Sequence, residues 1–207
     1  MGTAEDIAEA VEAHPGVNRV ELIGSRARGT ATELSDWDFH VTAEDFGEVA
    51  ADLPGLVAPY EPLAAQWDPL GDAESYLLVL PGPVKVDLIF PDVPRSWNPP
   101  WRVGPDTLPA MNAHFWDWTL WLVSKRHHGM TDRVRGELLK MSHHLLQPLG
   151  IEALPLSLEE AAERFVRARN RLEKRYGSHI SRRLEEEVLP LVHASDRDHY
   201  RPSGLRS

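Results

Sequence analysis

The sequence contains no cysteine among its 207 residues. Disulfides and thiolate metal ligands are therefore excluded, and a metal ion would depend on oxygen or imidazole ligands. The sequence also lacks an apolar run near the roughly 20 residues that a membrane span requires. Its first fifteen residues are acidic and amphipathic, whereas a secretory signal has a basic region followed by an apolar one. We therefore expect a cytoplasmic protein without a membrane partner.

Basic side chains are scarce in the first half of the chain. Residues 1–105 hold 18 acidic and 6 basic side chains, whereas residues 106–207 hold 14 acidic and 16 basic ones. An acidic half of this size repels the phosphate backbone of nucleic acids and attracts small or cationic partners. The charge pattern thus disfavours nucleic acid as a partner, although solubility alone also explains it.

A stretch with six prolines between Pro91 and Pro109 coincides with the change in charge. Proline continues neither a helix nor a central strand, so this stretch is typical of a linker. Helix and strand signals alternate before it, and only amphipathic helices follow. We predict an α+β protein with a first domain over residues 1–105 and an α-helical bundle domain over residues 106–207.

The expected elements follow from hydrophobic periodicity and capping residues. Thr3 with Asp6 and Ser157 with Glu160 resemble capping boxes, and Pro54 is expected to end a helix. The predicted helices span residues 3–13, 43–53, 108–128, 132–149, 158–176 and 179–193, and the predicted strands span residues 17–23, 36–42, 63–67, 75–80 and 84–90.

The segment from Leu22 to Val41 contains the residues best suited to chemistry. Asp36 and Asp38 are two apart in a predicted strand, so their carboxylates project from the same face. Two such carboxylates repel each other unless a cation or proton lies between them, and Mg²⁺ accepts carboxylate oxygens. Gly24 permits close approach of a phosphate, and the Ser25 hydroxyl can donate to it. The following Arg26 and Arg28 either add positive charge or are solvated loop residues.

A third carboxylate, Asp87, lies in the apolar strand predicted over residues 84–90. It shares a face with Lys85 and Ile89, and it is costly to bury there without a partner. If this strand lies beside residues 36–42, the three aspartates converge. The alternative is that Asp36 caps a turn and Asp87 is a buried, hydrogen-bonded carboxylate.

This ordered set resembles the signature of DNA polymerase β-type nucleotidyltransferases, and the chain looks most like the bacterial aminoglycoside and lincosamide nucleotidyltransferases. The specific motif covers Gly24–Asp38 and Asp87. Trp37 departs from it, because a smaller aliphatic residue is common there. The resemblance implies a small mixed β-sheet with flanking helices, followed by the helical domain.

The same resemblance implies a chemistry. Two Mg²⁺ ions would be ligated by Asp36 and Asp38, and Asp87 would ligate the catalytic ion, take the acceptor's proton, or do both. ATP or another nucleoside triphosphate would bind near Gly24 and Ser25. An NMP group, expected to be AMP, would pass to a hydroxyl and pyrophosphate would leave.

One aromatic helix of the second half contains further candidates. Asp117, Trp121 and Lys125 are spaced by four residues and share a face. They could meet the acceptor, its rings and the triphosphate respectively, and the resemblance implies a lysine on such a helix that reaches the phosphates. The alternative is that the tryptophans form domain core and that Lys125 lies at the surface.

Three functions compete at this point. The first is transfer to a small-molecule hydroxyl, with an aminoglycoside-like antibiotic as acceptor and antibiotic resistance as the outcome. The second is modification of a protein within a toxin–antitoxin pair. The third is an inactive scaffold that binds nucleotide without turnover. The long helical half favours the first over the second.

Overall fold

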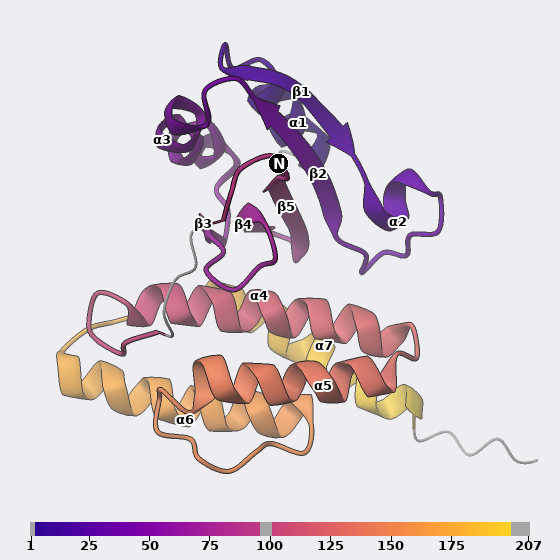
Figure 1. The fold of residues 1–207 in the computed structure, drawn as a ribbon. Helices are drawn as coiled ribbons and strands as arrows, with labels where there is room; N and C mark the ends of the chain where they lie inside the picture. The colour runs from indigo at the N-terminus through magenta and orange to yellow at the C-terminus, as the bar shows by residue number, and fades with distance from the viewer. Residues whose placement is uncertain (1–2, 96–100, 200–207) are drawn as a thin grey trace, which may run out of the picture. The chain divides into compact units, whose positions relative to one another are not determined.

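The computed structural model describes residues 3–95 and 101–199 (Figure 1). The chain divides into two compact units, Met1–Pro100 and Trp101–Ser207. Pro99 and Pro100, which belong to the predicted linker, lie outside the described residues. In the part of the chain that is described, no helix has the length and apolar character needed to cross a membrane.

The first unit is a five-stranded mixed sheet with helices, and the predicted α+β class is confirmed (Figure 1). The strand order is β1-β2-β5-β4-β3, and only the β2–β5 pair is parallel. The strands are β1 (Val17–Leu22), β2 (Trp37–Ala43), β3 (Ala64–Trp67), β4 (Glu74–Leu80) and β5 (Val84–Phe90), and the helices are α1 (Ala4–Glu12), α2 (Gly24–Ala27), α3 (Phe46–Val57) and the 3-10 turn η1 (Ala58–Tyr60).

The two long helices of this unit cover one face of the sheet. Phe39 and Leu88 are register partners on β2 and β5, and both are buried against α1 and α3. Helix α1 begins as expected, because the Thr3 side chain accepts from Asp6 N while the Asp6 carboxylate accepts from Thr3 N. Strand side chains alternate between faces, so the residues beside Phe39 and Leu88 in sequence project from the opposite face.

The expectation that Pro54 ends a helix was wrong. Helix α3 continues through Pro54 to Val57, and it begins at Phe46 with Asp45 as its N-cap. Val49, Leu53 and Val57 lie four residues apart and are buried in the core. Burial of Val57 in particular stabilises an additional helical turn. This stabilisation offsets the loss of the backbone hydrogen bond that Pro54 cannot donate.

The second unit contains helices α4 (Leu108–His127), α5 (Thr131–Met141), α6 (Leu158–Tyr176) and α7 (Arg183–His199). The predicted helix over residues 132–149 is instead α5 followed by the π-helical turn η2 (Ser142–Leu146). Helix α7 begins four residues later than expected. Ser157 caps α6 by accepting from Glu160 N, but the Glu160 carboxylate accepts from Leu156 N, so only half of the capping box forms.

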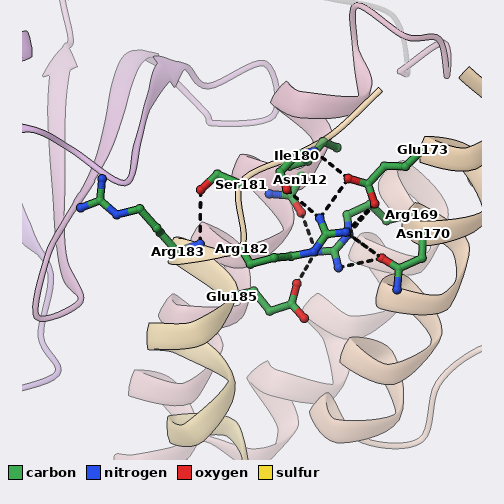
Figure 2. A network of polar contacts seen from close by, with 9 residues as sticks. All are labelled: Asn112, Arg169, Asn170, Glu173, Ile180, Ser181, Arg182, Arg183 and Glu185. Carbon is green, nitrogen blue, oxygen red and sulfur yellow. Dashed lines mark hydrogen bonds and ion pairs between the residues drawn. The ribbon is translucent and has the colours of Figure 1, made fainter. Parts of the chain in front are cut away.

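A buried arginine joins three helices of this unit (Figure 2). Arg169 on α6 is 1% exposed; its Nη1 donates to Asn112 Oδ1 on α4 at 3.1 Å and also to Glu185 on α7. Glu173, one turn further along α6, accepts from Arg182 Nη2 at 2.5 Å. A buried guanidinium is costly unless its donors are satisfied, so these partners are required for the packing of the helices.

Candidate active site

Three aspartates of the first unit lie together. Asp36 immediately precedes β2, Asp38 is on β2 and Asp87 is on β5. One carboxylate oxygen from each residue lies within 4.8 Å of the other two. Among the described residues, this is the group of three that could hold a metal ion. The structure thus brings together all three predicted metal ligands.

The sheet register produces this convergence. The parallel β2–β5 pairing places Asp38 opposite Asp87, and Phe39 opposite Leu88 on the other face. Since the helices cover the face of Phe39 and Leu88, the aspartates project from the face that α1 and α3 leave uncovered. The condition set for Asp87, that its strand lies beside residues 36–42, is therefore met.

Asp87 has an unusual electrostatic environment. Burial raises the pKa of its carboxyl, the ammonium of Lys85 lowers it, and the negative charges of Asp36 and Asp68 raise it again. The net direction is upward from the ordinary value of 3.8. Burial is the largest cause of this shift, and the Lys85 ammonium offsets it only in part.

The donor set fits a hard divalent cation. All three side chains offer carboxylate oxygens, the ligands that Mg²⁺ and Mn²⁺ prefer. Asp36 is 8% exposed, so its charge is also held largely away from water. The geometry and the donor set of this cluster therefore fit a divalent cation.

Gly24 lies close to the side chain of Asp38. Its φ is +69°, which favours glycine, and a Cβ there would lie 3.2 Å from Asp38 Cγ and overlap Oδ2. Ile23 N donates to Asp38 O at 2.8 Å, which ties the two segments together. The sequence pointed to close approach of a phosphate at Gly24, and the structure adds close approach of a predicted metal ligand.

Arg26 holds the loop that carries Asp36. Its Nη2 donates to Ser35 O at 2.7 Å, and its Nε donates to Asp36 O at 3.1 Å. The guanidinium also lies 4.1 Å from the centroid of the Trp37 ring. Two roles were considered for Arg26, namely added positive charge and a solvated loop residue. Neither role describes this contact. In the sequence, the only signal of this contact was Trp37, which stands where the family pattern commonly has a smaller aliphatic residue.

The remaining predicted nucleotide contacts lie on or beside α2. Ser25 is half-buried on this helix, and its carbonyl accepts from Thr30 N at 3.0 Å. Arg28 is the C-cap of α2 and is exposed. Ser25 follows Gly24 directly and Arg28 ends the same short helix, so both lie on the same segment as the contact with Asp38.

The predicted helical-domain residues lie on α4 of the second unit. Asp117 is buried, whereas Trp121 and Lys125 are half-buried. Lys125 Nζ lies 4.8 Å from the centroid of the Trp121 ring, and Arg133 Cζ lies 5.0 Å from it. None of these residues lines the cavity of about 450 Å³ found between the end of α4, α5 and the start of α6.

Two charged residues that lie beside the aspartates were not predicted to be site residues. Lys85 Nζ lies 2.8 Å from Asp87 Oδ1. Asp68 follows β3, and its Oδ1 accepts from Leu70 N at 2.8 Å. The sequence signal for the place of Lys85 in the site was its position on the same strand face as Asp87. Asp68 is brought near by the strand order, which periodicity does not reveal.

Comparison with known proteins identifies the domain that carries this cluster. Residues 4–91 match the family model of the nucleotidyltransferase domain, and this range includes the three aspartates and Gly24. A comparison with curated protein sequences gives no match.

Two solved structures illustrate the structural likeness. The polymerase core of TRAMP, an RNA surveillance complex, is 14% identical, with a TM-score of 0.35 over 61% of this chain. The present chain spans 40% of that chain. An aminoglycoside 6-adenyltransferase from Bacillus subtilis is 11% identical, with a TM-score of 0.33, over 95% of this chain and 99% of that chain.

Proposed function

From the premise that residues 4–91 are a nucleotidyltransferase domain and the chain therefore a nucleotidyltransferase, we propose that it transfers AMP from ATP to a hydroxyl of a small molecule. Pyrophosphate is the second product. The observation that carries this proposal is the cluster of Asp36, Asp38 and Asp87 inside the matched range. We assign catalysis to residues 1–105 and substrate binding to residues 106–207.

In this proposal the three aspartates hold two Mg²⁺ ions. Bound ions of this kind neutralise the phosphates and stabilise the attacking and leaving oxygens of an in-line displacement. Asp36 and Asp38 serve as ligands of both ions. Asp87 is a ligand, the group that takes the acceptor's proton, or both, and its place opposite Asp38 in the sheet supports either role.

The nucleotide contacts in the first unit are proposed for one segment. Gly24 and Ser25 approach the triphosphate with backbone and hydroxyl donors, and the exposed Arg28 adds positive charge. Support comes from the contact of Gly24 with Asp38, which places this backbone directly beside a proposed metal ligand.

The second unit is proposed to contribute Lys125 to the triphosphate, and Asp117 and Trp121 to the acceptor. The pairing of Lys125 with the Trp121 ring supports a joint role, because a cation held over an indole is kept in a defined position. A cationic acceptor such as an aminoglycoside suits the 18 acidic and 6 basic side chains of residues 1–105. Inactivation of such an antibiotic in the cytoplasm would be resistance.

The test is transfer of label from ATP labelled at the α-phosphate. Aminoglycosides, lincosamides and a bacterial lysate serve as acceptors, with wild type and Asp38→Ala compared. Asp92, exposed in the turn that follows β5, provides the matched control Asp92→Ala. We expect Asp38→Ala to remain folded and to lose at least about a thousandfold in rate, since loss of a metal ligand raises the barrier by several kcal/mol.

The outcomes separate the competing functions. Label on a small molecule supports the proposal, and label on a lysate protein supports modification of a protein partner. Binding of ATP without any transfer supports a scaffold. Normal transfer by Asp38→Ala would exclude the proposed mechanism.

A further inference from the structure

Lys85 places an ammonium group among the carboxylates of the site. Its Nζ lies 2.8 Å from Asp87 Oδ1, and the two side chains are 10% and 18% exposed. Lys85 and Asp87 are two residues apart on β5, so both project from the face that carries the aspartates. A cation is therefore built into the group of residues proposed to bind metal.

We propose that Lys85 determines in which form the metal ion enters the site. Its ammonium holds Asp87 in the metal-free protein and weakens binding of a free divalent cation. The same charge strengthens binding of the metal–triphosphate complex. Lys85 is thus a specificity-determining residue that makes metal loading depend on the nucleotide. This inference rests on the proposed function.

The sign of the Lys85 charge sets the direction of both effects. Three carboxylates attract a divalent cation, and a positive charge beside one of them opposes that attraction. A metal ion chelated by a triphosphate carries a net negative charge, so the same ammonium attracts it. One residue consequently shifts the two affinities in opposite directions, which a purely structural ion pair does not do.

The position of Lys85 makes this charge effective. The β-ladder fixes its backbone, because Lys85 pairs with Val79 on β4. Its low exposure reduces screening by water and salt, so the interaction is stronger than that of a surface pair. Lys140 offers the contrast, since its side chain is 63% exposed and pairs with Glu137 on the same helix.

The experiment measures binding of Mn²⁺ by calorimetry, with and without a non-hydrolysable ATP analogue, at about pH 8, where carboxylates are ionised. Wild type is compared with Lys85→Met and Lys85→Gln, which remove the charge, and with Lys85→Arg, which keeps it. Lys140→Met controls for the change in net charge. Thermal melting establishes that each variant is folded, and the two neutral variants provide independent chances of a folded protein.

We expect the neutral variants to bind Mn²⁺ alone roughly tenfold more tightly than wild type and to lose a similar factor for the Mn²⁺–analogue complex. Lys85→Arg and Lys140→Met should match wild type within about threefold. Unchanged or weaker binding of Mn²⁺ alone by folded neutral variants overturns the role of Lys85 and leaves the metal site intact. Absence of Mn²⁺ binding to wild type in either condition overturns the metal site itself and the proposed function with it.

Discussion

A comparison of two glycines tests whether the contact between Gly24 and Asp38 sets the geometry of the site. Gly24 and Gly29 share a φ of +69°, but a Cβ at Gly29 would meet nothing within 4 Å, whereas at Gly24 it would overlap Asp38 Oδ2. Alanine at either position costs about 1–2 kcal/mol in the left-handed region. The two substitutions therefore impose the same backbone strain, and only one of them displaces a proposed metal ligand.

The expected magnitude follows from this overlap. To relieve it, the Asp38 carboxylate must move by about 1 Å, and a misplacement of that size costs on the order of a hundredfold in rate. We expect Gly24→Ala to lower kcat about a hundredfold and to weaken binding of Mn²⁺. Gly29→Ala should lower only the free energy of unfolding, by about 1–2 kcal/mol, with kcat unchanged within about twofold.

The assays are urea unfolding for stability, calorimetry for Mn²⁺, and label transfer for kcat. Agreement in stability together with a difference in rate and metal affinity supports the reasoning. Equal rates for the two variants, or normal Mn²⁺ binding by Gly24→Ala, would refute it, because the extra methyl group would then have displaced nothing of consequence.

Two further predictions concern the polar contacts of each unit. Arg26→Lys keeps the charge but loses the planar fork held over the Trp37 ring, so Mn²⁺ affinity should fall about tenfold, while the exposed Arg19→Lys should leave the calorimetric isotherm unchanged. In the second unit, the hydrogen bond from Arg182 holds the pKa of Glu173 below its usual 4.5. Its stabilisation is thus present above that value and is lost as pH falls through the lower, folded-state pKa. Unfolding measured from pH 7 downwards should show the stability gap between wild type and Glu173→Gln closing as the pH falls below 4.5, with the exposed Glu163→Gln as the control substitution.

Much of the fold follows from local sequence patterns. Alternating polar and apolar residues placed β5 at its observed bounds and β2 within one residue, and Thr3 and Ser157 located the starts of two helices. The continuation of α3 through Pro54 was missed, because it depends on the burial of Val57 in a core that local rules do not describe. Likewise, the order of the strands is a tertiary property, and no period in the sequence encodes it.

The residues of the candidate site likewise divide into those that local sequence patterns predict and those that depend on tertiary structure. Asp36 and Asp38 were recognised because a spacing of two on a strand fixes a shared face. The place of Asp87 beside them required the parallel pairing of β2 and β5, which the sequence left as a condition. The contact of Arg26 with the Asp36 loop spans nine or ten residues through an irregular segment, where no periodicity applies. The charge of Lys85 was visible, but its distance of 2.8 Å from Asp87 was not.

The register between β2 and β5 restricts how this site can change during evolution. Asp38 and Asp87 face each other, although α3, β3 and β4 intervene in the chain. Insertions in the loops between these elements leave the register intact, so the number of residues separating the two aspartates is free to drift. An insertion of one residue within β5, between Val84 and Asp87, instead turns the carboxylate towards the helix-covered face. Homologous sites are therefore recognised by whether the aspartate occupies an odd or an even position within the strand. The number of residues that separates it from the first motif is not a reliable guide.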